Sequence, residues 1–291
     1  MITETNLTTT TPVTNFREFE SHIGFGKKLR TRVRDLTILS LSIGRSIGGQ
    51  PGSIRFPYYH HVFDDECRGF SRQLDFFRRH GELLSIDEAV KLLASGDPID
   101  GNYFCITFDD GFKNNATNAV PILVEKEVPA AFFIVTGLIG TDYQKDRDRL
   151  LKFYDHGQIL MEFLDWADCR QMVSAGMTIG SHTVNHARLS ELDTAGASEE
   201  MAKSKSAIEE NLGQSCEHFC IPFGLPDRDF NFHRDPRLAS KSGYRSLLTA
   251  QRGANRMGST PFFIKRDHTL ANWGNYQLRY FFSLDHSNGG R

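Results

Sequence analysis

Short apolar segments with the period of a β-strand alternate along this chain with amphipathic helical segments. The predicted strands cover residues 54–62, 103–108, 130–135, 177–180 and 216–221. The predicted helices cover residues 69–79, 117–126, 166–175 and 197–212, and a further helix begins at Ser85. Repeated β-then-α units predict a parallel sheet covered by helices, and about seven units suit a barrel better than an open sheet. We therefore expect an α/β fold, a distorted (β/α) barrel of about seven parallel strands.

The first 50 residues do not follow this pattern. Residues 1–14 are rich in threonine and poor in apolar side chains, which predicts a disordered tail. Residues 16–47 have helical periodicity, and their first half carries the basic residues Lys27, Lys28, Arg30, Arg32 and Arg34. Two interpretations stay open: a helix packed on the main domain, or a basic helix over residues 27–47 that contacts a membrane or a lipid-linked glycan. We divide the chain into a tail (1–14), a helical appendage (15–50) and a barrel domain (51–291).

Composition limits the partners and the compartment. The net charge is −2, from 34 basic and 36 acidic residues, so no overall positive field favours binding to nucleic acid. The five cysteines are irregularly spaced, which indicates thiols in a reducing compartment and not a disulfide framework. The N-terminus lacks the features of a signal peptide, and no run approaches the roughly 20 apolar residues of a membrane span. We expect a cytoplasmic protein, peripheral at most to the inner membrane.

Polar and turn-forming residues lie at the carboxyl ends of four of the predicted strands. These segments are 58–61 (YYHH), 109–111 (DDG), 182–186 (HTVNH) and 222–224 (PFG). In parallel α/β folds the carboxyl ends of the strands meet on one face, where active sites form. The sequence therefore predicts a single pocket that these segments share.

Two histidines and a pair of aspartates in these segments suggest a metal site. His182 and His186 lie four residues apart, so on one helical turn their imidazoles would share a face and hold one ion. One carboxylate of the Asp109–Asp110 pair would be the third ligand, and the other would stay a free base. An aspartate pair also fits a solvated turn, and two histidines also fit surface or core positions. Their joint placement at strand ends favours a hydrolytic metal site, because three ligands leave room for water and substrate.

Two of these segments resemble the first two motifs of the NodB-homology polysaccharide deacetylases, carbohydrate esterase family four. They are 107–111 (TFDDG) and 181–186 (SHTVNH), and the stretch 164–180 that leads to the second is also similar. The resemblance covers roughly residues 54–270. It implies a barrel of seven or eight βα units that binds one divalent metal ion, zinc or another transition metal. It also implies removal of the N-acetyl group from an N-acetylated sugar, glycan or glycan precursor, as in surface polysaccharide biosynthesis.

The resemblance also implies a role for each motif residue. Asp109 would be the general base. The metal ligands would be Asp110, His182 and His186. The backbone N–H of Phe223, directly after the proline of the third motif, would donate to the oxyanion of the tetrahedral intermediate.

Two positions depart from the family pattern. The family carries an arginine, ion-paired to the base, where this chain has Cys220, so Arg266 is our candidate to orient the base. The histidine that protonates the departing amine is matched only loosely by His268, whose pKa the neighbouring Asp267 would raise. His60, at the end of the first predicted strand, is the alternative general acid. Imidazole suits this role because its pKa lies near neutral pH.

Three aromatic residues near the expected rim are candidates for stacking on a sugar ring, with core packing as the competing interpretation. They are Tyr59, Phe223 and Trp273. Three functional hypotheses remain: a deacetylase of an N-acetylated sugar or oligosaccharide, a hydrolase of a non-sugar amide, imide or O-acetyl ester, and a catalytically inactive glycan-binding protein. A full ligand set beside a free carboxylate favours an enzyme.

Overall fold

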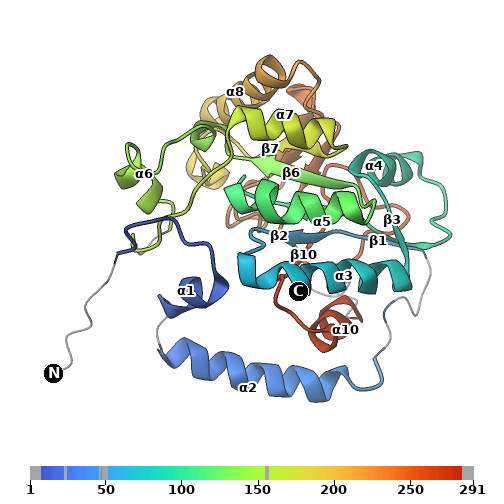
Figure 1. Cartoon of the computed structure of the whole chain (residues 1–291). Helices are drawn as coiled ribbons and strands as arrows, with labels where there is room; N and C mark the ends of the chain where they lie inside the picture. Colours follow the sequence, from blue (N-terminus) through green and yellow to red (C-terminus); the bar gives the residue numbers. More distant parts are fainter. Residues whose placement is uncertain (1–7, 23–24, 46, 48–51, 155–156, 284–291) are drawn as a thin grey trace.

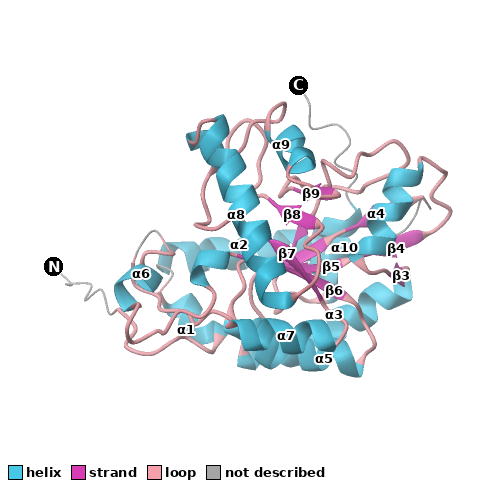
Figure 2. Cartoon of the chain, turned by 90° about the horizontal axis from the view of Figure 1, so that it is seen from above, coloured by secondary structure: helices cyan, strands magenta, loops and turns pink. Residues whose placement is uncertain are grey.

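The computed structural model describes residues 8–22, 25–45, 47, 52–154 and 157–283. Its centre is a seven-stranded, all-parallel sheet that is surrounded by helices (Figure 2). In spatial order the strands are β10 (Asp267–His268), β2 (Pro57–Tyr59), β5 (Ile106–Phe108), β6 (Ala130–Ile134), β7 (Thr178–Ser181), β8 (His218–Cys220) and β9 (Ser246–Leu248). The expected distorted (β/α) barrel of about seven parallel strands is confirmed.

The segment 264–268 links the two edges of this sheet. Its first residue, Ile264, donates a backbone hydrogen bond of 3.0 Å to Leu247 of β9. Three residues later, Asp267 donates one of 2.8 Å to Phe56, which directly precedes β2. Because one short segment pairs with both edges, the sheet curves into a barrel. Arg266, which lies between these two contacts, is buried.

Two predicted strands are each interrupted by a one-residue bend. A small sheet contains β1 (Ser53–Arg55), β4 (Asn102–Phe104) and β3 (Glu82–Leu83) in the order β1-β4-β3. Ile54 lies opposite Tyr103 in this sheet, and Tyr58 lies opposite Thr107 in the main sheet, which is the same register. The predicted strands 54–62 and 103–108 therefore pair in one register, with the strands interrupted at Phe56 and Cys105, and the first of them ends at Tyr59 instead of residue 62.

Helices cover the outside of the barrel (Figures 1 and 2). They are α3 (Cys67–His80), α4 (Ile86–Ser95), α5 (Val120–Glu125), α6 (Arg147–Leu151), α7 (Trp166–Ser174), α8 (Thr194–Leu212), α9 (Asp235–Lys241) and α10 (Asn275–Ser283). Shorter turns are η1 (Asp64–Glu66), η2 (Asn115–Ala119), η3 (Thr136–Leu138) and η4 (Leu189–Glu191). The ends follow local chemistry: Ser85 and Glu88 form a capping box before α4, and α8 ends at Gly213, whose φ of 66° suits glycine.

Apolar side chains fill two layers, one inside the barrel and one between the sheet and the helices. Strand β6 shows the alternation that produces both layers. Ala131 and Phe133 belong to the inner cluster. Phe132 and Ile134 belong to the outer cluster, which the helices cover. The barrel interior is thus packed with apolar side chains.

The N-terminal residues pack on the barrel domain. Thr9 and Val13 each donate a 2.9 Å backbone hydrogen bond, to Gln158 and Leu160, and Val13 is buried. The prediction of a disordered tail is therefore wrong for residues 8–14, because two backbone bonds and one apolar anchor fix this stretch. Residues 1–7 lie outside the described part of the chain. The division of the chain at residues 14 and 50 stays a prediction.

The predicted helix 16–47 is two helices, α1 (Phe16–Ser21) and α2 (Phe25–Ser42). Helix α2 lies beside α10 (Figure 1), where Arg45 covers the ring of Tyr280 at 5.1 Å. Leu36 and Ile43 face outward, 69% and 79% exposed. None of the described helices has both the length and the apolar sequence needed to cross a bilayer. Contact of residues 27–47 with a membrane or a lipid-linked glycan stays a prediction.

A buried carboxyl at the start of α3 should make stability depend on pH. Burial raises the pKa of Glu66 from 4.5 to about 7, although its carboxylate accepts a 3.1 Å hydrogen bond from the Phe63 N–H. Because the pKa is higher in the folded state, the stabilisation from protonation is complete below pH 4.5 and is lost as pH rises through 7.

We therefore expect Glu66→Gln to be more stable than the parent protein at pH 8, by up to about 3 kcal/mol. The two proteins should have equal stability near pH 4.5, where the parent side chain is protonated when folded. Urea unfolding of both proteins at the two pH values measures this. Equal differences at both pH values would contradict the assignment.

Candidate active site

A cleft of about 400 Å³ lies at the carboxyl ends of the strands. The segments that follow β2, β5, β7, β8 and β9 all contribute to it, together with β10. Of the residues proposed from sequence, the cleft contains His60, Asp109, Asp110, His182, His186, Phe223, Arg266 and His268. Tyr59 and Trp273 are not part of it.

Three ligand atoms converge in this cleft. The Asp110 Oδ1 atom lies 3.5 Å from His182 Nε2 and 3.3 Å from His186 Nε2. This oxygen is buried and has no hydrogen-bond partner in the described part of the chain. The Nδ1 atom of His182 lies 2.8 Å from the Cys220 carbonyl oxygen, so it must carry the proton, and Nε2 is left free to bind a metal. An unpaired buried oxygen beside free imidazole nitrogens fits a divalent cation.

The two histidines lie on a loop and not on one helical turn, so that expectation is wrong. Thr183 and His186 have φ values of 67° and 54°, which no helical turn contains. Asp110 and Phe223, also at the cleft, have φ values of 75° and 62°. Each such conformation costs roughly 1–3 kcal/mol in a residue other than glycine. Backbone strain is therefore concentrated where side chains must be aimed at one point.

Asp109 forms a two-pronged ion pair with Arg266. Both guanidinium Nη atoms lie 2.7 Å from the carboxylate oxygens, and Arg266 also donates to the Thr249 carbonyl at 2.8 Å. Burial by itself raises the pKa of Asp109, but Arg266 outweighs it and holds the pKa below its usual value. The carboxylate is therefore ionised at neutral pH. Arg266 therefore forms an ion pair with Asp109, the residue that we expected it to orient.

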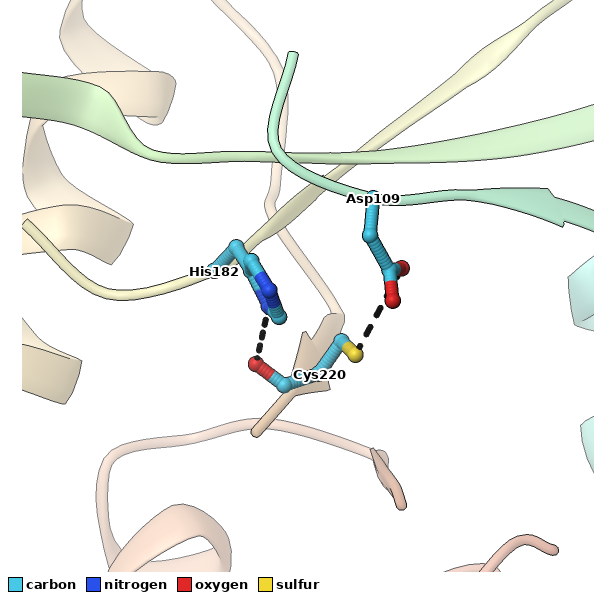
Figure 3. A group of neighbouring side chains, drawn as sticks. All are labelled: Asp109, His182 and Cys220. Carbon is cyan, nitrogen blue, oxygen red and sulfur yellow. Dashed lines mark hydrogen bonds between the residues drawn. The ribbon is translucent and has the colours of Figure 1, made fainter. Parts of the chain in front are cut away.

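A second group of ligand atoms, Asp109, His182 and Cys220, is less suited to a cation (Figure 3). Burial raises the pKa of the Cys220 thiol, which stays protonated and donates toward Asp109 Oδ1 at 3.7 Å. His182 turns its Nδ1 toward the Cys220 carbonyl, and Asp109 already faces the Arg266 guanidinium. A metal ion here would meet a fixed positive charge.

A third group lies away from the cleft. It consists of Asp87, Glu217 and His218. His218 is the first residue of β8, at the opposite end of the strand. Arg245 already pairs with Asp87 and with Glu217. Among the described residues, the set of Asp110, His182 and His186 is therefore the best candidate metal site.

Two histidines compete for the role of proton donor. His60 is 35% exposed to the cleft, and its Nε2 lies 4.0 Å from Asp110 Oδ2. His268 also lines the cleft, and its ring centre lies 5.4 Å from that of His60. Burial, His60 and Arg252 together lower the pKa of His268 to about 3, so this ring is neutral at pH 7.

The expectation that Asp267 raises the pKa of His268 is wrong. The Asp267 carboxylate is buried and accepts hydrogen bonds from Arg55 at 2.9 Å and Arg252 at 3.4 Å. The Asp267 carboxylate therefore points toward two arginines. Adjacent residues of a strand point to opposite faces, so the neighbours do not meet.

Two of the proposed stacking residues lie in the core, so those assignments are wrong. Tyr59 is fully buried and donates its hydroxyl to Gln73 at 2.8 Å. Trp273 is buried and stacks on Phe281, with ring centres 4.7 Å apart. Sequence reasoning missed Tyr58, the strand neighbour that faces the cleft.

Two aromatic rings at the rim are covered by cations. The Tyr58 ring lies 4.2 Å from the Arg266 guanidinium and supports the ion pair with Asp109. The third stacking candidate, Phe223, is on the rim and 48% exposed, with Arg188 over its ring at 4.1 Å. The N–H of Phe223 makes no hydrogen bond within the described residues. That N–H is thus available to an oxyanion.

The model of the polysaccharide deacetylase family matches residues 97–245, just over half of the chain. This chain belongs to the polysaccharide deacetylase family. YxkH of Bacillus subtilis, provisionally named a polysaccharide deacetylase, is 22% identical over 211 residues, 70% of this chain and 67% of its own. A chitooligosaccharide deacetylase of Sinorhizobium fredii is 26% identical over 168 residues, 53% of this chain and 67% of its own.

Solved structures share the fold. IcaB from Ammonifex degensii has a TM-score of 0.65 at 22% identity and covers 81% of this chain and 99% of its own. The Streptococcus pyogenes deacetylase PplD has a TM-score of 0.65 at 21% identity, over 80% and 99% of the two chains.

The cleft of this family member also contains residues from outside the family match. Asp109, Asp110, His182 and His186 lie within residues 97–245. His60, Arg266 and His268 lie outside that range. The segments before and after the family match therefore contribute three of the candidate site residues.

Proposed function

We propose that this protein removes the N-acetyl group from an N-acetylated sugar or oligosaccharide. The reaction uses one divalent metal ion, with zinc as the first candidate, and the ion is held by Asp110, His182 and His186. The convergence of these three ligand atoms beside an ionised Asp109 is the observation that carries the proposal. Two histidines and one carboxylate suit a catalytic site, because such a set leaves coordination positions open. A role in surface polysaccharide biosynthesis is part of the proposal.

The chemistry divides among few groups. When bound, the ion would polarise the acetyl carbonyl and lower the pKa of the attacking water. Asp109 takes the proton of that water, with Arg266 fixing both carboxylate oxygens. The Phe223 N–H donates to the oxyanion that develops on the carbonyl oxygen. The amide C–N bond then breaks, the departing amine receives a proton from His60, and acetate is left.

We assign the proton donor to His60 because it is open to the cleft, whereas His268 is neutral at pH 7. We expect His60→Asn to lower kcat on an acetamide substrate by about 10²–10⁴-fold, the usual range for a general acid. His268→Asn, the matched control, should cost less than tenfold by the same argument. Steady-state rates of acetate release measure both.

An aryl acetate ester separates a proton donor from a positioning residue. Its phenolate leaves without protonation, so His60→Asn should retain most of the parent rate on this substrate. An equal loss on both substrates, or a larger loss in His268→Asn, would contradict the assignment.

The activity itself is tested by product analysis. The parent protein, loaded with Zn²⁺, should release acetate and free amine in equal amounts from N-acetylglucosamine oligomers. Turnover of a cyclic imide or an O-acetyl ester with no acetate from any N-acetylated sugar would favour the alternative hydrolase. Tight metal binding without turnover of any acylated substrate would favour a glycan-binding protein.

A further inference from the structure

The N-terminal strap, residues 8–22, is held against the cleft although it precedes the family match. Thr9 and Val13 of the strap bond to residues 158 and 160, as described above. In addition, the Thr14 carbonyl accepts a 3.0 Å hydrogen bond from the Asp64 N–H. The Phe16 N–H donates to the Asp65 carboxylate at 2.8 Å. Two separate segments of the barrel domain, 158–160 and 64–65, therefore fix the strap between Thr9 and the start of α1.

Helix α1 places two phenylalanine rings in the cleft. Phe16 and Phe19 lie three residues apart and so share one face of the helix. The Phe19 ring centre lies 5.3 Å from Phe63 and 5.8 Å from Tyr154, and Phe16 lies 6.2 Å from Phe63. Phe153 completes this surface and lies 5.0 Å from the His186 ring. We call Phe16, Phe19, Phe63, Phe153 and Tyr154 the aromatic wall.

The polar atoms of the aromatic wall are already occupied. The Tyr154 hydroxyl lies 2.8 Å from His61 Nε2, and the other ring nitrogen of His61 lies 3.2 Å from the Asn114 amide. Burial and the neighbouring His60 lower the pKa of His61 to about 3, so this ring carries no charge at neutral pH. Phe63 is buried, so the other four rings of the wall, which are half-buried, offer aromatic surface and little hydrogen-bonding capacity to a ligand.

The cleft also has no free lysine or arginine among its described lining residues, and Arg188, which lies over Phe223 at the rim, is paired with Asp229. Arg266 is the one lysine or arginine among them, and both of its Nη atoms are bound to Asp109. A diphosphate group is recognised by arginine, lysine or a cluster of backbone N–H groups. An uncharged sugar ring instead presents C–H faces that stack on aromatic rings.

We infer that the aromatic wall is a subsite for an uncharged sugar ring adjacent to the acetylated one. The strap thereby adds to this cleft a ring-stacking surface that lies outside the family match. This inference rests on the proposed function, because it assigns a binding subsite of the same cleft.

Acetate release from N-acetylglucosamine, its dimer, its tetramer and the UDP-linked monomer tests the inference. For the parent protein we expect kcat/KM at least about tenfold higher on the tetramer than on either monomer, the effect of two stacking contacts. The double variant Phe16→Ala/Phe19→Ala should lose this preference through a higher KM for the tetramer.

Two further variants separate ring stacking from folding. Phe19→Leu keeps most of the volume and should still lose part of the preference, whereas Phe19→Tyr should keep it. Phe232→Ala is the matched control, because Phe232 is 41% exposed and packs on Phe263 away from the cleft. It should leave the preference unchanged.

Calorimetric titration with the tetramer separates failure of the subsite from failure of the proposed function. Binding that weakens about tenfold in the double variant, in a protein that releases no acetate, would support the subsite and overturn the deacetylase proposal. Acetate release with an unchanged oligomer preference in the double variant would overturn the subsite alone. A parent protein that does not bind the tetramer, or that prefers the UDP-linked sugar, would also overturn it.

Discussion

Replacing Asp109 with asparagine should lower kcat for acetate release by about a thousandfold and leave the metal content of the protein unchanged. Asparagine keeps the size of the side chain and one oxygen for Arg266, but it cannot take a proton from water. Metal content should persist because the ligand atoms belong to Asp110, His182 and His186. Metal analysis and initial-rate measurements on the same preparation test both expectations.

The neighbouring residue offers a matched control. Asp110→Asn makes the same chemical change one position along the chain, at the carboxylate whose Oδ1 faces both histidines. This variant should lose most of its bound metal and its activity together. If Asp109→Asn loses the ion and Asp110→Asn keeps it, the roles of the two aspartates are reversed.

Removing the charge of Arg266 should have the largest effect on stability. Arg266 is 1% exposed and Asp109 is 3% exposed, so Arg266→Met leaves a buried carboxylate without its partner. Breaking a buried pair from one side costs about 3–5 kcal/mol. The free energy of unfolding, from urea titration at pH 7, measures this loss.

The same variant should shift the pH dependence of activity. Burial raises the pKa of Asp109, and Arg266 is the main group that lowers it. Without Arg266 the pKa rises, so the base is ionised only at higher pH. The acidic limb of kcat/KM should therefore move to higher pH in Arg266→Met.

Two controls accompany this prediction. Arg266→Lys keeps the charge but not the two-pronged geometry, so its stability and acidic limb should be intermediate. Arg252→Met removes a less buried arginine that bonds Asp267 and the His268 carbonyl, and should leave the acidic limb in place. A stable Arg266→Met with an unshifted limb would contradict the role given to the ion pair.

The main features of the fold and of the site could be predicted from local sequence. Strand and helix periods indicated the parallel barrel, and the carboxyl ends of strands carry the polar segments that meet in the cleft. The spacing of His182 and His186 indicated a shared ligand role, and the structure brings both to Asp110. A strained loop carries the two histidines to this position. No local sequence propensity indicates the positive φ at Thr183 in that loop.

Errors arose where a side chain's direction depends on distant partners. Tyr58 and Tyr59 are chemically alike, and only the register of the sheet decides that the first faces the cleft. Asp267 turns from His268 because Arg55, 212 positions earlier in the chain, binds its carboxylate. Residues 8–14 of the strap resembled a disordered tail because their packing depends on residues 64–65 and 158–160.

Anomalous diffraction at the zinc edge, from crystals of the zinc-loaded protein, tests the central claim most directly. We predict one peak, about 2.0–2.2 Å from a carboxylate oxygen of Asp110 and from the Nε2 atoms of His182 and His186, with Asp109 not bonded to it. A peak bonded to Asp109, His182 and Cys220, or the absence of a peak in this cleft, would contradict the account.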